Sequence, residues 1–180
     1  MNMNLPNKLT IFRIALVPVF LIILYIDNGA TNWVAFAIFC VASATDALDG
    51  YIARKYNLIT DFGKFMDPLA DKLLVCSALI ALTDLGRIFG WIVIIIIARE
   101  FIISGFRLVA AGKGKVIAAG KWGKIKTVVQ MAATMLLIID FKNMPMFVIT
   151  QIFVYAALVL TVISLIDYFI SNKEVLHGGN

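Results

Sequence analysis

The chain has 180 residues, of which 62% are hydrophobic and only 15% are charged, and its mean hydropathy is +0.95. Soluble domains are about 25% charged and about 45 to 50% apolar, so this composition excludes an ordinary soluble domain and predicts an integral membrane protein. The formal net charge of +5 comes from basic residues that flank the apolar runs, so we expect a membrane surface, and no nucleic acid, as their partner.

Apolar runs separated by polar or glycine-containing breaks predict six transmembrane helices. The predicted helices cover residues 11–26, 32–53, 65–83, 88–110, 122–140 and 146–170. About 20 residues cross a hydrocarbon layer of roughly 30 Å, so the six crossings and their loops use nearly the whole chain. We therefore predict an all-α integral membrane protein in which residues 1–180 form one domain. The first run lacks a basic segment followed by a cleavage site, so we expect it to stay in the mature chain.

Lysine and arginine are distributed unevenly among the loops between these helices. Nearly all of them lie on one side of the membrane, and the opposite loops carry only Arg87 and Lys142. Cytoplasmic loops are the ones that carry the excess of basic residues. We therefore predict that both termini are cytoplasmic, and an even number of crossings, which places both termini on the same side, agrees with this prediction.

An acidic motif runs from the end of the second predicted helix to the start of the third. It reads Asp46-x2-Asp49-Gly50-x2-Ala53-Arg54-x8-Gly63-x3-Asp67-x3-Asp71. A carboxylate at membrane depth costs several kcal/mol unless it is paired, hydrated or bound to a metal. Separations of three and four residues place each aspartate pair on one face of a helix, and two antiparallel neighbouring helices would bring both pairs together.

Four adjacent carboxylates need positive charge between them. At an effective dielectric constant near 20, each repulsive contact costs about 4 kcal/mol. Oxygen ligands suit hard divalent cations, and pairs of such ions about 4 Å apart recur in phosphoryl chemistry. We therefore predict a site for two Mg²⁺ or Mn²⁺ ions. Gly50, Gly63 and Ala53 leave room for a substrate, and Arg54 has the planar donor group that grips phosphate bidentately.

Two alternatives to a phosphoryl-transfer site remain at this point. The aspartates could be solvated residues at the membrane interface that cap helices and balance nearby lysines. They could also belong to a divalent-cation channel or transporter, although such proteins usually carry their carboxylates near the bilayer midplane or along a pore. Crowding at one membrane face, beside an arginine and glycines, favours a phosphate substrate.

The motif resembles, at each of its fixed positions, the signature of the CDP-alcohol phosphotransferases. The resemblance implies a membrane enzyme with this number of helices, usually a homodimer, in which an alcohol displaces CMP from a CDP-linked donor. It also implies that Asp46, Asp49, Asp67 and Asp71 hold two divalent ions and that Asp71 is the catalytic base. The residues expected to contact the donor are Asn7, Thr10, Asp49, Gly50, Ala53, Arg54 and Gly63. For Asn7 and Thr10, capping of the first helix is an alternative explanation.

Three further stretches, at residues 5–13, 99–100 and 119–130, resemble the bacterial phosphatidylglycerophosphate synthase branch of that family. This resemblance implies CDP-diacylglycerol as donor, sn-glycerol 3-phosphate as acceptor, and a multi-pass enzyme of the bacterial cell membrane with its active site at the cytoplasmic face. Phosphatidylglycerol in cardiolipin synthesis, an inositol phosphate or serine are alternative acceptors within the family.

Basic residues near the start of the fifth predicted helix favour an anionic acceptor. We predict that Arg107, Lys121 and Lys126 bind the phosphate of the glycerol phosphate, because cations and the free amides of a helix start together form a phosphate site. Alternatively, such residues only set the topology or contact anionic lipid headgroups. Arg99 and Glu100 are expected to form a structural ion pair within the fourth helix rather than a ligand contact.

Overall fold

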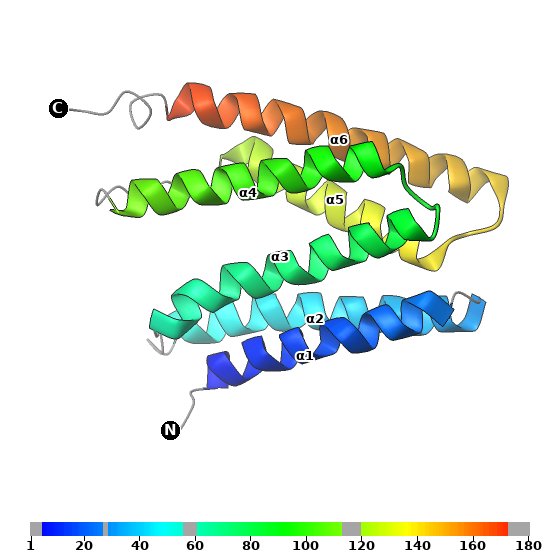
Figure 1. Cartoon of the computed structure of the whole chain (residues 1–180), viewed down its shortest axis with the longest axis horizontal. Helices are drawn as coiled ribbons and strands as arrows, with labels where there is room; N and C mark the ends of the chain where they lie inside the picture. The colour runs from blue at the N-terminus through cyan, green and yellow to red at the C-terminus, as the bar shows by residue number, and fades with distance from the viewer. Residues whose placement is uncertain (1–4, 27–28, 56–60, 113–119, 173–180) are drawn as a thin grey trace. The chain divides into compact units, whose positions relative to one another are not determined.

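The structure, a computed structural model, describes the backbone of residues 5–26, 29–55, 61–112 and 120–172. Within these ranges the side chains of residues 5–7, 46–54, 61–68, 71 and 111 are not described. The described residues form six helices (Figure 1): α1 (Leu5–Ile26), α2 (Gly29–Lys55), α3 (Asp61–Asp84), α4 (Gly90–Gly112), α5 (Lys121–Ile139) and α6 (Met144–Ser171). These ranges contain no strand, so the prediction of an all-α fold is confirmed for them.

The breaks predicted between the later helices are confirmed, and local chemistry explains them. α3 ends where Gly86 adopts a φ of +72°, a left-handed conformation that favours glycine. The amide of Gly86 donates to the carbonyl of Thr83, and that of Arg87 donates to the carbonyl of Leu82, which is the pattern of a Schellman motif. α6 begins after Asn143 and has a proline in its first turn, where a missing amide hydrogen is tolerated.

The chain divides into two compact units. The N-terminal unit contains α1, α2, α3 and residues Leu137–Asp140, and the C-terminal unit contains α4, the rest of α5, and α6. In the N-terminal unit α1 packs along both α2 and α3. Its core is apolar and includes Phe20 of α1 and Phe39 of α2, whose ring centroids are 5.7 Å apart.

The core of the C-terminal unit is more polar. α4 packs against α6, which buries one stripe of residues with the three- and four-residue spacing of a helix face. The stripe consists of Thr150, Val154, Ala157, Thr161, Ser164 and Tyr168. Half of these side chains are hydroxyl-bearing serine or threonine, so this unit buries groups that require hydrogen bonds.

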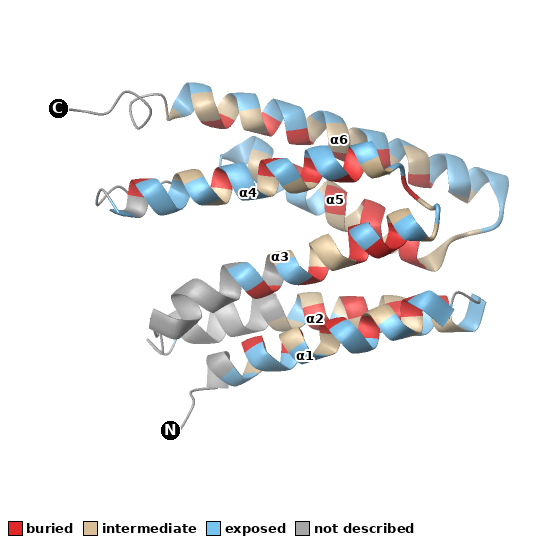
Figure 2. Ribbon diagram, viewed as in Figure 1, coloured by how far each residue is buried: buried red, intermediate tan, exposed pale blue. Residues whose placement is uncertain are grey.

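Large apolar side chains are exposed along the helices, which Figure 2 shows as pale blue faces. In the described residues, three helical segments are long and apolar enough to cross a membrane, namely Lys8–Ile26, Lys121–Ile139 and Met144–Ser171. α4 has sufficient length, but it carries Arg99, Glu100 and Arg107. Outward-facing apolar side chains on helices of this length fit contact with lipid, and they support the prediction of a membrane protein.

Candidate active site

The acidic motif lies on two neighbouring helices of the N-terminal unit. Asp46 and Asp49 belong to the C-terminal part of α2, and Asp67 and Asp71 to the N-terminal part of α3. α2 and α3 contact one another. The connection from Lys55 to Asp61 reaches at most about 20 Å, since an extended residue spans roughly 3.3 to 3.6 Å, so the two ends lie at the same end of the unit.

The backbone supports the prediction of a shared metal site. Both aspartate pairs lie on helical backbone at spacings of three and four residues, and all four ligands are carboxylates, which suit Mg²⁺ or Mn²⁺. Among the residues whose side chains are described, no group of three or more acidic, histidine or cysteine residues could hold a metal ion. The side chains of the predicted group lie outside that set, so the ligand assignment stays a prediction.

Of the other residues predicted to contact the donor, the structure describes the side chain of Thr10. It is fully buried, and α1 begins at Leu5, so Thr10 lies inside the helix and does not cap it. Arg13, three residues later on the same helix, is also fully buried. Burying a charged side chain is costly unless the charge is paired or hydrogen-bonded, and buried charges in membrane helices are typical of functional sites. This part of α1 is therefore a functional candidate as well.

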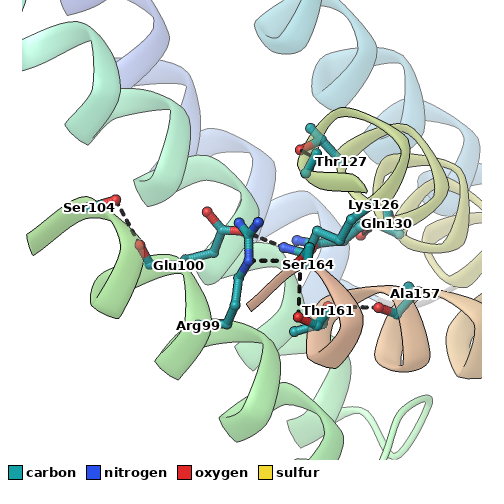
Figure 3. Close-up of polar contacts among 11 residues, drawn as sticks. Arg99, Glu100, Ser104, Lys126, Thr127, Gln130, Ala157, Thr161 and Ser164 are labelled. Carbon is teal, nitrogen blue, oxygen red and sulfur yellow. Dashed lines mark hydrogen bonds and ion pairs between the residues drawn. The ribbon is translucent and has the colours of Figure 1, made fainter. Parts of the chain in front are cut away.

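A polar cluster joins the three helices of the C-terminal unit (Figure 3). The Arg99 Nε donates to the Ser164 Oγ at 3.1 Å, and the Arg99 Nη1 donates to the Glu100 Oε1 at 3.1 Å. The Lys126 Nζ donates to the same carboxylate oxygen. We call these four residues, Arg99, Glu100, Lys126 and Ser164, the basic cluster. The ion pair predicted between Arg99 and Glu100 is confirmed, and it extends to both other helices of the unit.

The basic cluster is largely buried. Lys126 is 1% exposed and Arg99 is 8% exposed. The Ser164 hydroxyl donates to the carbonyl of Thr161 at 3.0 Å, so it is fixed while it accepts from Arg99. Nearby on α5, Gln130 is buried, and its Oε1 has no hydrogen-bond partner in the described part of the chain. The contact of Ser164 with Arg99 could not be predicted from the sequence, because a single polar residue in an apolar run does not reveal which helix it faces.

The three residues predicted to bind the acceptor phosphate have different environments. Lys126 is a buried member of the basic cluster, whereas Lys121, the first residue of α5, and Arg107 of α4 are exposed. The guanidinium of Arg107 lies 5.9 Å from the centroid of the Tyr168 ring. Lys121 has no ion pair within the described ranges. Exposed cations at a helix end and a helix start suit a small anion arriving from water, while Lys126 acts from inside the unit.

Residues 3–163 match the family model of the CDP-alcohol phosphatidyltransferases. The chain belongs to this family, which confirms the resemblance carried by the acidic motif. A family of membrane-embedded phospholipid-synthesising transferases also agrees with the exposed apolar faces of the helices.

Curated relatives match the chain over nearly its whole length. A CDP-diacylglycerol--glycerol-3-phosphate 3-phosphatidyltransferase of Bacillus subtilis is 45% identical over 98% of this chain and 99% of its own length. A protein of the same name from Rickettsia felis is 39% identical over 95% of this chain and 96% of its own length. A probable phosphatidylglycerophosphate synthase of Mycobacterium tuberculosis is 43% identical over 92% of this chain and 79% of its own length.

Proposed function

We propose that the protein transfers the phosphatidyl group of CDP-diacylglycerol to sn-glycerol 3-phosphate and releases phosphatidylglycerol phosphate and CMP. One observation carries this proposal: the chain has the complete acidic motif of its family, and relatives that match it end to end are named for this reaction. The alternative acceptors considered from the sequence have no comparable support, and neither does the alternative function of a cation transporter.

The acidic motif is proposed to hold the donor. Asp46, Asp49, Asp67 and Asp71 would bind two Mg²⁺ or Mn²⁺ ions, which neutralise the diphosphate and stabilise the departing CMP when bound. The remaining donor contacts are assigned to Asn7, Thr10, Asp49, Gly50, Ala53, Arg54 and Gly63. The planar guanidinium of Arg54 suits phosphate oxygens, and the glycines and Ala53 leave space for the nucleotide.

The reaction is an in-line displacement at phosphorus. The primary hydroxyl oxygen of glycerol 3-phosphate attacks the β-phosphorus of CDP-diacylglycerol, and the bond from that phosphorus to the CMP oxygen breaks. Asp71 is proposed to take the hydroxyl proton, which makes the oxygen a better nucleophile. Holding acceptor and donor side by side supplies a large part of the rate enhancement, because two bound reactants no longer have to meet in solution.

The acceptor is proposed to bind through its phosphate to Arg107, Lys121 and Lys126. The exposure of Arg107 and Lys121, and the position of Lys121 at the start of α5, support this assignment. The amides of the first turn of a helix have no intrahelical acceptor and point outward from the helix start, so they add donors for an anion.

The membrane arrangement is part of the proposal. All six helices are proposed to cross the membrane, with both termini and the active site at the cytoplasmic face of the bacterial cell membrane. The basic residues then face the compartment that supplies the water-soluble acceptor, and the lipid donor enters from the inner leaflet. We further propose one catalytic domain over residues 1–180 and a homodimeric assembly, both on the resemblance to the family.

One assay tests the proposal. Purified protein in detergent is incubated with labelled CDP-diacylglycerol, Mg²⁺ or Mn²⁺, and a panel containing glycerol 3-phosphate, phosphatidylglycerol, inositol phosphate and serine, and CMP release is followed. The proposal requires turnover with glycerol 3-phosphate and none with the others. Turnover with another acceptor would overturn the choice of acceptor. No CMP with any alcohol, together with divalent-ion flux in liposomes, would overturn the enzyme assignment.

A further inference from the structure

The guanidinium of Arg99 reaches all three helices of the C-terminal unit. Its Nε donates to Ser164 of α6, and its Nη1 donates to Glu100 of its own helix. Its Nη2 lies beside the first turn of α5, where a Cβ added at Gly123 would be 3.3 Å away. Two of the three nitrogens therefore fix the group, and the third faces α5.

The Nη2 of Arg99 has no acceptor within the part of the chain that the structure describes. An arginine placed only to pair with Glu100 needs one or two nitrogens for that purpose. A nitrogen that is held in place, carries part of a positive charge and lacks an acceptor is a donor available to a ligand.

Arg99 shares its carboxylate with a second cation. Arg99 and Lys126 both donate to the same oxygen of Glu100. The guanidinium therefore does not have that carboxylate to itself, and its Nη2 is directed away from Glu100 toward α5. Asp167 of α6 lies near the start of α5 as well, but Lys121 and Lys124 lie there too, so the region stays positive.

Two glycines at the start of α5 have neighbours of opposite charge. A Cβ at Gly120 would lie 3.1 Å from the Asp167 Oδ2, so that carboxylate occupies the space beside Gly120. Arg99 occupies the space beside Gly123. An anion at the first helical turn is therefore attracted toward Gly123, where the guanidinium and the outward-pointing amides both donate, and repelled from the side of Asp167.

We propose that Arg99 is a further acceptor-binding residue, whose Nη2 donates to the phosphate of glycerol 3-phosphate, and that Glu100 and Ser164 are positioning residues that hold the guanidinium for this contact. The inference rests on the proposed function and extends its acceptor site inward from Arg107 and Lys121. The chemistry recognised is a phosphate group, which the acceptor carries as a monoester and the donor as a diphosphate. We assign the Arg99 contact to the phosphate of the acceptor.

The test is a set of variants assayed for CMP release with each substrate varied in turn. Arg99→Lys keeps the charge and a partner for Glu100 but loses the planar fork, so the KM for glycerol 3-phosphate should rise at least tenfold, which corresponds to about 1.4 kcal/mol. The kcat and the KM for CDP-diacylglycerol should change less than about threefold. Ser164→Ala removes only the anchor of Nε and should raise the same KM by roughly threefold.

A variant without any charge change checks the geometry. Gly123→Ala places a methyl group against Nη2, so the guanidinium must shift by a few tenths of an ångström and the acceptor KM should rise by roughly three- to tenfold. The matched control is Gly105→Ala in α4, where a Cβ meets nothing within 4 Å, and its acceptor KM should equal that of the wild type.

Inorganic phosphate provides a second measurement. Its inhibition constant against glycerol 3-phosphate should rise in Arg99→Lys by the same factor as the KM. An unchanged acceptor KM with a lower melting temperature would overturn the inference and leave Arg99 as a structural partner of Glu100. An equal rise in the donor KM would overturn it in favour of a diphosphate contact. If the wild type does not use glycerol 3-phosphate, the proposed function is wrong. The inference is tested separately by thermal unfolding: it is wrong if inorganic phosphate raises the melting temperatures of the wild type and of Arg99→Lys equally.

Discussion

Arg87 holds together three segments of the N-terminal unit, and its removal gives a prediction that can be worked out from the contacts. Its Nη1 donates to the carbonyls of Leu137 and Ile138, at 2.9 and 2.8 Å, at the end of α5. Its Nη2 donates to the Asn32 Oδ1 of α2 at 3.3 Å, and its Nε lies 3.6 Å from the Asp140 Oδ2. The side chain is 6% exposed, so water does not easily replace these partners.

The magnitude follows from the two short bonds. The last carbonyls of a helix have no intrahelical donor and carry its negative partial charge, so a buried guanidinium is a favourable partner for them. Hydrogen bonds to charged groups contribute about 1.5 to 3 kcal/mol each. The longer contacts add less, because Asp140 is partly exposed and its ion pair is screened. Arg87→Ala should therefore lower the free energy of unfolding by at least about 3 kcal/mol, the lower end of the sum for the two short bonds.

Thermal unfolding in detergent, followed by the fluorescence of the three tryptophans, measures this change. For a chain of this length about 3 kcal/mol corresponds to roughly 6 to 12 °C in the melting temperature. Arg87→Lys keeps the charge but reaches fewer acceptors, so it should fall between the wild type and Arg87→Ala. Lys124→Ala, at an exposed position, is the control and should have the same melting temperature as the wild type. Arg87→Ala melting within about 1 °C of the wild type would refute the reasoning.

Three predictions concern the reaction itself. Asp46→Asn and Asp67→Asn each remove one charge from the proposed metal site, so both should abolish CMP release at ordinary Mg²⁺ concentrations without unfolding the protein; a Mg²⁺ titration that shows a near wild-type rate contradicts the assignment. Asp71→Asn should lower kcat by about 10² to 10⁴ while CDP-diacylglycerol still binds, and an equal loss of donor binding would show that Asp71 acts only as a ligand. Arg107→Ala and Lys121→Ala should each raise the acceptor KM by roughly tenfold to a hundredfold with an unchanged donor KM; if both constants move together, these residues serve lipid headgroups or topology.

The helices could be predicted from the sequence because their signals are local. A long apolar run specifies a helix in lipid, and residues such as Gly86 and Pro145 mark ends by their own backbone chemistry. The prediction that the first helix begins at residue 11 is wrong, because α1 begins at Leu5. The residues before the apolar run are mostly polar, so hydropathy does not show that they belong to the helix. Polar residues at a helix start carry too little information to fix its first turn.

The acidic motif was also predictable, because every residue in it lies within one short stretch and its three- and four-residue spacings predict that each aspartate pair shares one helix face. The basic cluster was not predictable in the same way. The sequence around Lys126 is that of a lysine at the membrane interface. Only the structure shows that Lys126 is buried and that its ammonium donates to Glu100 of α4. Ser164 has no signal at all beyond a hydroxyl in an apolar helix. Contacts between residues far apart in the chain depend on helix rotation, which hydrophobic patterning determines only coarsely.

The two units carry opposite charges for the proposed chemistry, and this division has a consequence for mutants. The proposed metal ligands all belong to α2 and α3 of the N-terminal unit, whereas Arg99, Arg107, Lys121 and Lys126 all belong to the C-terminal unit. Substitutions in α2 and α3 should therefore change the metal requirement and donor use, and those in α4 and α5 should change acceptor use, even where both abolish product formation.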